Sequence, residues 1–381
     1  MIRLNLRRNT RGIWASLRRL SQRGGRSGAL RWGRVLRCPA ILALAASHAA
    51  SAQPVQTIPT ISSMANEIYT ISHQDMSWRG HPYRVFMAMP RLGQTRQDNM
   101  TALYILDGNA QFPLAVNAVL AHWTPLPQAD KATQATELPV IVGLGYPEDK
   151  AYPLAARTRD YTYAAPGEAF AAGGGAADFY DFLRYKVRPY IHRQLTTDPD
   201  RQILAGHSFG GLFALYVLLN HPDAFDNYVI GSPSLWWGNG AIVSGADGRA
   251  PSILGQKKTM SEEEIVESGR RTAVSGRRAA GSDTAAATVG NTYPVVGKNT
   301  RVTILQGEYE ENPKADPAMT PERLARMAQR RSPINARSLD RWLQAQGVHS
   351  EFTLVERSGH GGVIPATISA AVRDALKQQG R

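Results

Sequence analysis

The sequence has only one cysteine among its 381 residues, Cys38, and it lies inside the first 52 residues. The rest of the chain therefore has no thiol for a disulfide, a thiolate metal site or a cysteine nucleophile. The apolar stretch Pro39–Ala46 is far shorter than the roughly 20 apolar residues that span a bilayer. We expect neither cysteine chemistry nor stable membrane insertion.

Acidic residues and lysine are absent from residues 1–52, which instead hold eleven arginines. The formal net charge of the whole chain is +13, so removing these eleven charges leaves +2 for the remainder. A nearly neutral body lacks the basic surface that nucleic-acid binding requires. We therefore expect no nucleic-acid partner.

The order of residue types in this first segment is typical of a secretory signal. Arginines precede the apolar stretch Pro39–Ala46, and the small residues Ala50–Ala52 then form a cleavage site before Gln53. The basic region is longer than in ordinary signals, and a start near Val35 would give an ordinary one. The alternative is a disordered basic tail on a cytoplasmic protein. We expect residues 1–52 to be a targeting segment and the mature protein to be periplasmic or secreted.

A polar linker at residues 53–65 leads into patterns that alternate between strands and helices. Strands are expected at 67–72 and 83–89 as an antiparallel pair at the sheet edge, and at 102–107, 138–144, 202–205, 228–230, 301–305 and 351–355. Helices are expected at 112–122, 177–195, 212–220, 333–346 and 363–377. The alternation predicts one α/β domain over residues 66–381, with a mostly parallel central sheet and helices on both faces.

Residues 238–299 interrupt this alternation. Glycine, alanine, serine and arginine dominate there, and residues 270–290 contain few apolar side chains. A short acidic stretch at 261–267 is compatible with a helix. We interpret 238–299 as a flexible insertion within the domain, not as a second domain.

The residues Gly206-His-Ser-Phe-Gly210 lie between a strand pattern and a helical pattern. A serine at the apex of such a sharp turn has an exposed hydroxyl, and the flanking glycines relieve the crowding of strand against helix. The helix N-terminus beneath it favours developing negative charge. The pattern predicts that Ser208 is a nucleophile.

A serine nucleophile needs a base, and His360 is the best candidate among nine histidines. It follows a strand pattern and has glycines on both sides, so its loop can bend back over the sheet edge. His207 adjoins Ser208, but we interpret it as a packing residue. The acid should follow the strand at 301–305, where Glu308, Glu310 and Glu311 occur; we choose Glu310. The alternative is a Ser–His pair without an acid.

The tetrahedral intermediate of acyl transfer requires two N–H donors for its oxyanion. The first expected donor is the main-chain N–H of Phe209, directly after the serine. The second should come from the loop after a central strand, where Asn109 is our choice and Gly108 the alternative.

The chain resembles the Putative esterase family of α/β-hydrolases, in particular its siderophore (enterobactin-type) esterase branch. The resemblance extends from about Glu67 to Lys377, apart from the insertion, which is longer than the family's usual connection. The stretches that carry it are Tyr104–Phe112, Arg157–Thr162, Gly206–Leu215, Ser232–Trp237, Gly307–Glu310, Asn335–Arg337 and His360–Pro365.

This resemblance implies an α/β-hydrolase fold and a Ser–His hydrolase that acts on small carboxylic esters without a metal; we expect no cofactor. It also matches Asn109 and Phe209 as the oxyanion hole. An acyltransferase would differ only in the acceptor, and a non-catalytic ligand-binding protein on the same scaffold is the other alternative. Arg157 or Arg159 could bind an acidic substrate group, and Trp236 and Trp237 could line an acyl pocket. Core packing and salt bridges explain these four equally well.

Overall fold

The computed structural model describes residues 57–91, 100–123, 138–195, 197–243, 300–330 and 332–379. The expected targeting segment at 1–52, the start of the linker and the possible helix at 261–267 lie outside these ranges.

The described strands form one eight-stranded sheet with the order β1-β2-β4-β3-β5-β6-β7-β8. The first strand pairs antiparallel with the second, the second antiparallel with β4, and all other neighbours are parallel. The mostly parallel sheet predicted from the sequence is thus confirmed. The strands are β1 Tyr69–Trp78, β2 His81–Pro90, β3 Met100–Ile105, β4 Val140–Gly145, β5 Thr197–His207, β6 Asn227–Gly231, β7 Arg301–Gly307 and β8 His349–Val355.

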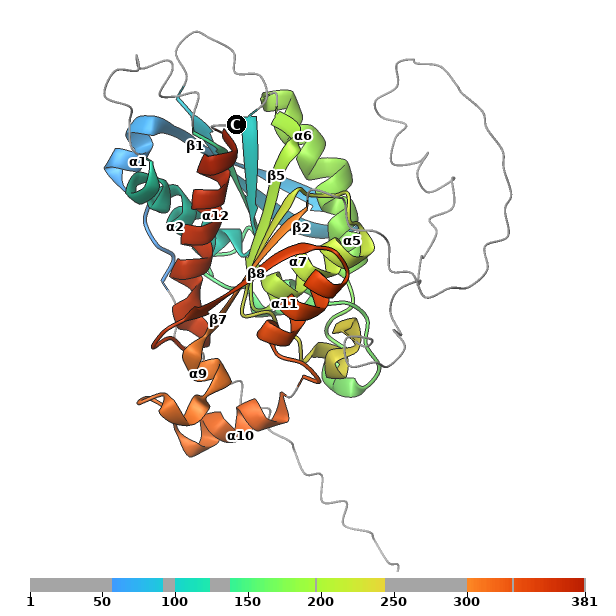
Figure 1. Cartoon of the computed structure of the whole chain (residues 1–381). Helices are drawn as coiled ribbons and strands as arrows, with labels where there is room; N and C mark the ends of the chain where they lie inside the picture. The colour runs from blue at the N-terminus through green and yellow to red at the C-terminus, as the bar shows by residue number, and fades with distance from the viewer. Residues whose placement is uncertain are drawn as a thin grey trace, which may run out of the picture. The chain divides into compact units, whose positions relative to one another are not determined.

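Helices cover both faces of this sheet, as expected, and each face has its own apolar core (Figure 1). The helices α1, α2 and α12 pack on one face, and α4, α5, α6, α7 and α11 pack on the other. β3 and β4 are buried along their whole length, which explains their unbroken apolar sequences. The helices are α1 Ser63–Ile68, α2 Gly108–His122, α4 Leu154–Tyr161, α5 Ala176–Phe182, α6 Arg188–Gln194, α7 Phe209–Asn220, α9 Glu308–Glu311, α10 Pro321–Gln329, α11 Ala336–Ala345 and α12 Ile364–Gln379.

Several boundaries differ from the sequence-based expectation. The end of the linker and the expected strand start at Glu67 are helical, because Ser62 caps α1 by accepting a hydrogen bond from the Ala65 N–H. A wider π turn at Leu183–Val187 divides the helix expected at 177–195 into α5 and α6. Pro189, which has no N–H to donate, follows directly in the first turn of α6.

The expected start of the insertion at residue 238 is also too early. The segment Trp237–Val243 continues from the loop after β6 and is kinked at Gly238, Asn239 and Gly240, whose φ values are positive. Ile242 and Val243 are buried in the core of the domain, so this segment belongs to the packed fold. The remainder of the expected insertion, residues 244–299, lies outside the described residues.

Candidate active site

Ser208 lies between the last residue of β5 and the first residue of α7, in a conformation that side-chain-bearing residues rarely adopt, with φ 62° and ψ −117°. A residue held this way stores about 1–3 kcal/mol of backbone strain. The turn requires glycine at position 206, because a Cβ there would overlap the main chain of Gly210. The residues Gly206–Gly210 therefore form the sharp strand-to-helix turn, with Ser208 at its apex, that the sequence predicts.

The strained serine is held in place by main-chain hydrogen bonds on both sides. Its N–H donates to the Gly231 carbonyl at 2.9 Å, and its own carbonyl accepts from Leu212 at 2.9 Å and Ser234 at 3.1 Å. Asp107 and Ser232, just beyond β3 and β6, also have positive φ values, 54° and 40°. Strained backbone conformations thus occur just after three neighbouring parallel strands, where the surrounding structure holds each residue in place.

The imidazole of His360 reaches Ser208 from a short 3₁₀ turn, His360–Val363, that follows β8. Its Nε2 lies 2.9 Å from the Ser208 Oγ, and its Nδ1 lies 2.6 Å from the Glu310 carboxylate. A carboxylate accepts but does not donate, so the Nδ1 carries a proton and the Nε2 is free to accept from the serine hydroxyl. The His360 side chain is 50% exposed, so this group opens to solvent.

The carboxylate of Glu310 receives three hydrogen bonds. Besides His360, the Ser232 hydroxyl donates to it at 2.6 Å and the Gly307 N–H at 3.0 Å. Burial raises the pKa of Glu310, but hydrogen bonds and charge from His360, then Ser232 and Gly307, outweigh burial and hold the pKa below its ordinary value. The carboxylate therefore stays ionised at neutral pH.

The other two glutamates of this stretch have different partners. Glu308 accepts a hydrogen bond from the Arg357 N–H at 2.7 Å, and Glu311 pairs with Arg337 at 3.3 Å. Both therefore serve the local structure of the loops. Of the three candidates for the acid, the structure brings only Glu310 to His360.

Both expected oxyanion donors lie in the first turn of a helix. Phe209 is the first residue of α7 and Asn109 the second of α2, and these helices begin just after the adjacent parallel strands β5 and β3. N–H groups in a first helical turn have no partner within the helix and carry its positive dipole end. The Asn109 side chain bonds to Tyr146 and Glu148, which fixes this residue. Gly108 is also in this turn, so the choice between the two stays a prediction.

Three residues contact the proposed catalytic group that the sequence did not assign to it. Ser232 contacts Glu310, and the Ser234 hydroxyl lies 3.3 Å from the Ser208 hydroxyl. His207, interpreted as packing, donates from Nε2 to the main-chain carbonyl of His360 at 2.7 Å. The available signal was position: all three lie at the carboxyl ends of parallel strands, where ligands bind in α/β sheets.

The two arginines considered for substrate binding are engaged inside the protein. Arg157 donates two hydrogen bonds to Asp107 at 2.8 and 2.9 Å, and Arg159 pairs with Asp160 at 2.7 Å. Neither is a free cation facing the serine, so the salt-bridge interpretation holds for both.

The two tryptophans differ from each other. Trp237 is buried, and its indole N–H donates to the Tyr163 carbonyl at 2.9 Å, so it belongs to the core. Trp236 is half-buried, and its ring centroid lies 5.8 Å from that of Phe209. Only Trp236 therefore remains a candidate for contact with substrate.

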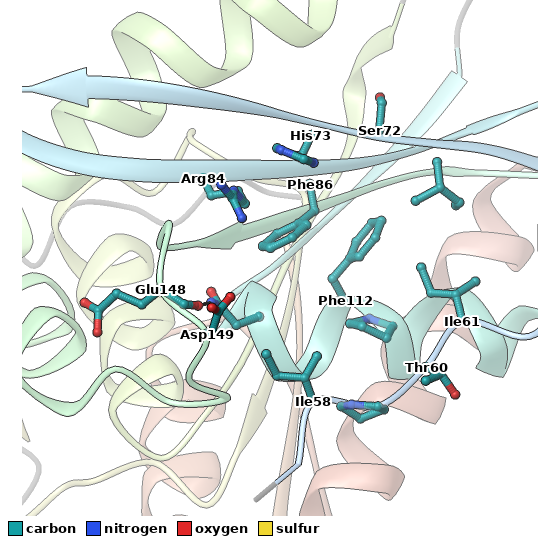
Figure 2. A pocket seen from close by; sticks show the side chains of 14 residues that line it. Ile58, Thr60, Ile61, Ser72, His73, Arg84, Phe86, Phe112, Glu148 and Asp149 are labelled. Atoms are coloured by element: carbon teal, nitrogen blue, oxygen red, sulfur yellow. Dashed lines mark hydrogen bonds between the residues drawn. The ribbon is translucent and has the colours of Figure 1, made fainter.

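Asn109 also contributes to a separate pocket of about 420 Å³, shown in Figure 2. Residues 58–61, β1, β2, the start of α2 and residues 148–149 form its walls. The stacked rings of Phe86 and Phe112, with centroids 5.5 Å apart, line its apolar side. Ser208, His360 and Glu310 are not among the residues that line it, so this pocket is distinct from the proposed reaction centre.

The described ranges offer neither a metal site of clustered side chains nor a membrane-spanning helix. There, no group of three or more histidine, cysteine, aspartate or glutamate side chains is arranged to hold a metal ion. No helix among the same residues combines the length and apolar character needed to cross a bilayer.

Comparison with known proteins relates the chain to one group of enzymes. The model of the family described as "Putative esterase" matches residues 78–339. The ferri-bacillibactin esterase BesA of Bacillus subtilis (strain 168) is 29% identical over 312 residues, which cover 78% of this chain and 86% of the relative. The siderophore triacetylfusarinine C esterase of Aspergillus fumigatus is 34% identical over 171 residues, 43% of this chain and 56% of that protein.

The fold has matches among solved structures as well. The siderophore hydrolase EstA of Aspergillus nidulans superposes with a TM-score of 0.57 at 22% identity, covering 85% of this chain and 99% of that one. The α/β-hydrolase fold expected from the sequence is thereby confirmed.

Proposed function

Since this chain belongs to the "Putative esterase" family of α/β-hydrolases and is a carboxylic ester hydrolase, we propose that it cleaves its ester through Ser208, His360 and Glu310. One observation supports this most directly: the Ser208 Oγ lies 2.9 Å from His360 Nε2, and His360 Nδ1 lies 2.6 Å from Glu310. This is the hydrogen-bonded order of nucleophile, base and acid by which a serine triad activates its hydroxyl for acyl transfer.

In the first half of the proposed reaction, the Ser208 Oγ attacks the ester carbonyl carbon while His360 Nε2 takes its proton. The carbonyl oxygen becomes an oxyanion and accepts hydrogen bonds from the N–H groups of Phe209 and Asn109. When the ester C–O bond breaks, His360 returns the proton to the departing alcohol. The acyl group is then bound to Ser208 as an ester.

In the second half, a water molecule attacks the acyl-enzyme as His360 takes one of its protons. Collapse of the second tetrahedral intermediate breaks the bond to Ser208, and His360 returns the proton to the serine oxygen. The ionised Glu310 keeps the Nδ1 proton in place and stabilises the imidazolium that forms in each half. The products are a carboxylic acid and an alcohol.

We propose a siderophore-type ester as the substrate. The support comes from the relatives, which are named as esterases of ferri-bacillibactin and of triacetylfusarinine C. The half-exposed His360 is compatible with a substrate that extends beyond the reaction centre. A panel of siderophore lactones and simple p-nitrophenyl esters measures this preference, and a higher kcat/KM for every simple ester would reject it.

The catalytic proposal is tested by fluorophosphonate labelling and ester hydrolysis in Ser208→Ala, His360→Ala and Glu310→Ala. We expect Ser208→Ala to abolish labelling and His360→Ala to lower kcat by at least about 10³-fold, because the base is lost. The matched controls are Ser77→Ala and His73→Ala, which change exposed residues of β1. If the Ser208→Ala variant is labelled as strongly as the wild type, Ser208 is not the nucleophile. If Glu310→Ala keeps full activity, Ser208 and His360 act as a pair without an acid.

The same assay separates the alternatives. A native protein that is never labelled would reject Ser208 as an activated nucleophile, and acyl transfer to added alcohols in preference to water would identify an acyltransferase. We also propose export, on the evidence of the sequence at residues 1–52. Amino-terminal sequencing of the protein recovered from the periplasm or the medium tests it, with Gln53 as the expected first residue.

A further inference from the structure

We infer that His207 is a positioning residue that holds His360, the base of the proposed mechanism, through its main chain. His207 is the last residue of β5, is only 4% exposed, and its Nε2 lies 2.7 Å from the His360 carbonyl oxygen. A carbonyl oxygen only accepts, so the Nε2 of His207 carries the proton that forms this bond. The two rings also lie against each other, with centroids 4.7 Å apart.

His207 is itself held firmly. Its main chain belongs to β5, where it pairs with Gly231 of β6 in the middle of the sheet. Burial, then the positive charge available on His360 and Arg157, lowers the pKa of His207 well below the ordinary value for histidine. The ring therefore remains neutral and keeps a single N–H donor in a fixed direction.

The turn that carries His360 needs such support. It contains Gly359, Gly361 and Gly362, and a Cβ on Gly361 would meet no atom within 4 Å. A glycine-rich turn at the surface has many accessible conformations, and all but one kind must be excluded for the imidazole to stay near the serine. A hydrogen bond to the buried sheet is an effective way to exclude them.

Two adjacent residues, His207 at the end of β5 and Ser208 in the turn after it, contact different parts of His360. Ser208 contacts the His360 side chain, and His207 contacts the His360 main chain, 153 residues away along the sequence. Because residues 207 and 208 share one rigid turn, the nucleophile and the anchor of its base move together. The serine–imidazole distance is then set by the sheet and not by the exposed turn.

Simple packing is the competing explanation, and two substitutions separate it from positioning. His207→Phe fills the same space with a ring but removes the donor and leaves the His360 carbonyl without it. His207→Gln removes the ring and with it the packing against neighbouring rings, but its side-chain amide can place an N–H donor where the Nε2–H of His207 was. A packing role predicts that phenylalanine is tolerated better, whereas a positioning role predicts that glutamine is.

The test measures kcat, KM and the rate of fluorophosphonate inactivation for the full chain, with thermal unfolding to check the fold. We expect His207→Phe to lower kcat and the inactivation rate by about 10- to 100-fold with KM changed less than about threefold, since the base is misplaced while the substrate surface is intact. His207→Gln should stay within about fivefold of the wild type. His207→Met provides a second donor-free variant if the phenylalanine variant does not fold.

The inference rests on the proposed roles of Ser208 and His360, and its failure is separable from theirs. If Ser208→Ala loses all activity while His207→Phe and His207→Met are as active as the wild type, only the inference is wrong. Equal losses of kcat in the glutamine, phenylalanine and methionine variants would also overturn it, because the donor would then be irrelevant. Activity in Ser208→Ala would reject the proposed function itself.

Discussion

The buried ion pair between Arg157 and Asp107 holds the loop after β3 at the active-site edge, and its removal has a calculable cost. The two side chains are 9% and 0% exposed and share two hydrogen bonds of 2.8 and 2.9 Å. The guanidinium also lies over the rings of Tyr161 and Phe209, at 5.7 and 5.3 Å from their centroids. Burial alone would lower the pKa of Arg157, but Asp107 outweighs it and raises that pKa, so the guanidinium stays charged.

Replacing Arg157 by methionine leaves the Asp107 carboxylate buried without its counter-charge. Breaking a buried pair in this way costs about 3–5 kcal/mol of unfolding free energy, which for a domain of this size lowers Tm by about 5–10 °C. Adding Asp107→Asn removes the stranded charge, and asparagine tolerates the left-handed backbone at this position, where φ is 54°. We expect the double variant to recover more than half of the lost stability.

Urea unfolding of the two variants measures these differences. The matched control is Arg79→Met, which removes partly exposed ion pairs with Asp178 and Asp181, at 2.6 and 3.9 Å, and should cost at most about 1 kcal/mol. Arg157→Met as stable as Arg79→Met would refute the reasoning. A raised KM with unchanged stability would instead make Arg157 a substrate-binding residue, the other interpretation of its sequence position.

Two further predictions concern pH and the substrate surface. Because the pKa of His207 is lowered in the folded protein by burial and by His360 and Arg157, the unfolded chain binds a proton below about pH 6.5 that the folded chain does not. His207 should therefore contribute a fall in unfolding free energy of up to about 1.4 kcal/mol per pH unit as the pH is lowered from 6.5 to 5. The slope of unfolding free energy against pH in urea titrations should be smaller in His207→Gln than in the wild type by this contribution, and equal slopes would contradict the prediction. Trp236→Ala should raise KM for aryl esters about three- to tenfold with kcat nearly unchanged, because Trp236 packs beside Phe209 at the nucleophile turn; an equal change for acetyl esters of small alcohols would count against a substrate contact.

The sequence was most informative where local chemistry and strand order combine. Ser208, Glu310 and His360 each follow their own strand pattern, and parallel strands end at one edge of a sheet, so three residues far apart in the chain were expected together. The structure brings them within hydrogen-bond distance. Their catalytic roles remain predictions until the variants are measured.

The sequence was least informative where a buried polar residue has a distant partner. In α4, Arg157 and Asp160 resemble surface residues in a short, polar stretch, and no helix was predicted there. Their partners Asp107 and Tyr146 come 50 and 14 residues earlier, so only the folded chain reveals why these charges are buried. The hydrogen bond of His207 was hidden for the same reason, since its acceptor, the His360 carbonyl, lies 153 residues away in the loop after β8.

The order of the strands also explains why the loop after β6 contacts both ends of the proposed catalytic group. β5 leads to Ser208, β7 leads to Glu310, and β6 lies between them in the sheet. Its loop must pass between these two residues, and it does so with Ser234 bonded to the first and Ser232 to the second. These contacts end at residue 234, before the packed segment that finishes at Val243. The contacts of this loop to the nucleophile and to the acid are therefore complete within residues 232–234, so the strand order alone brings one short loop to both ends of the proposed catalytic group.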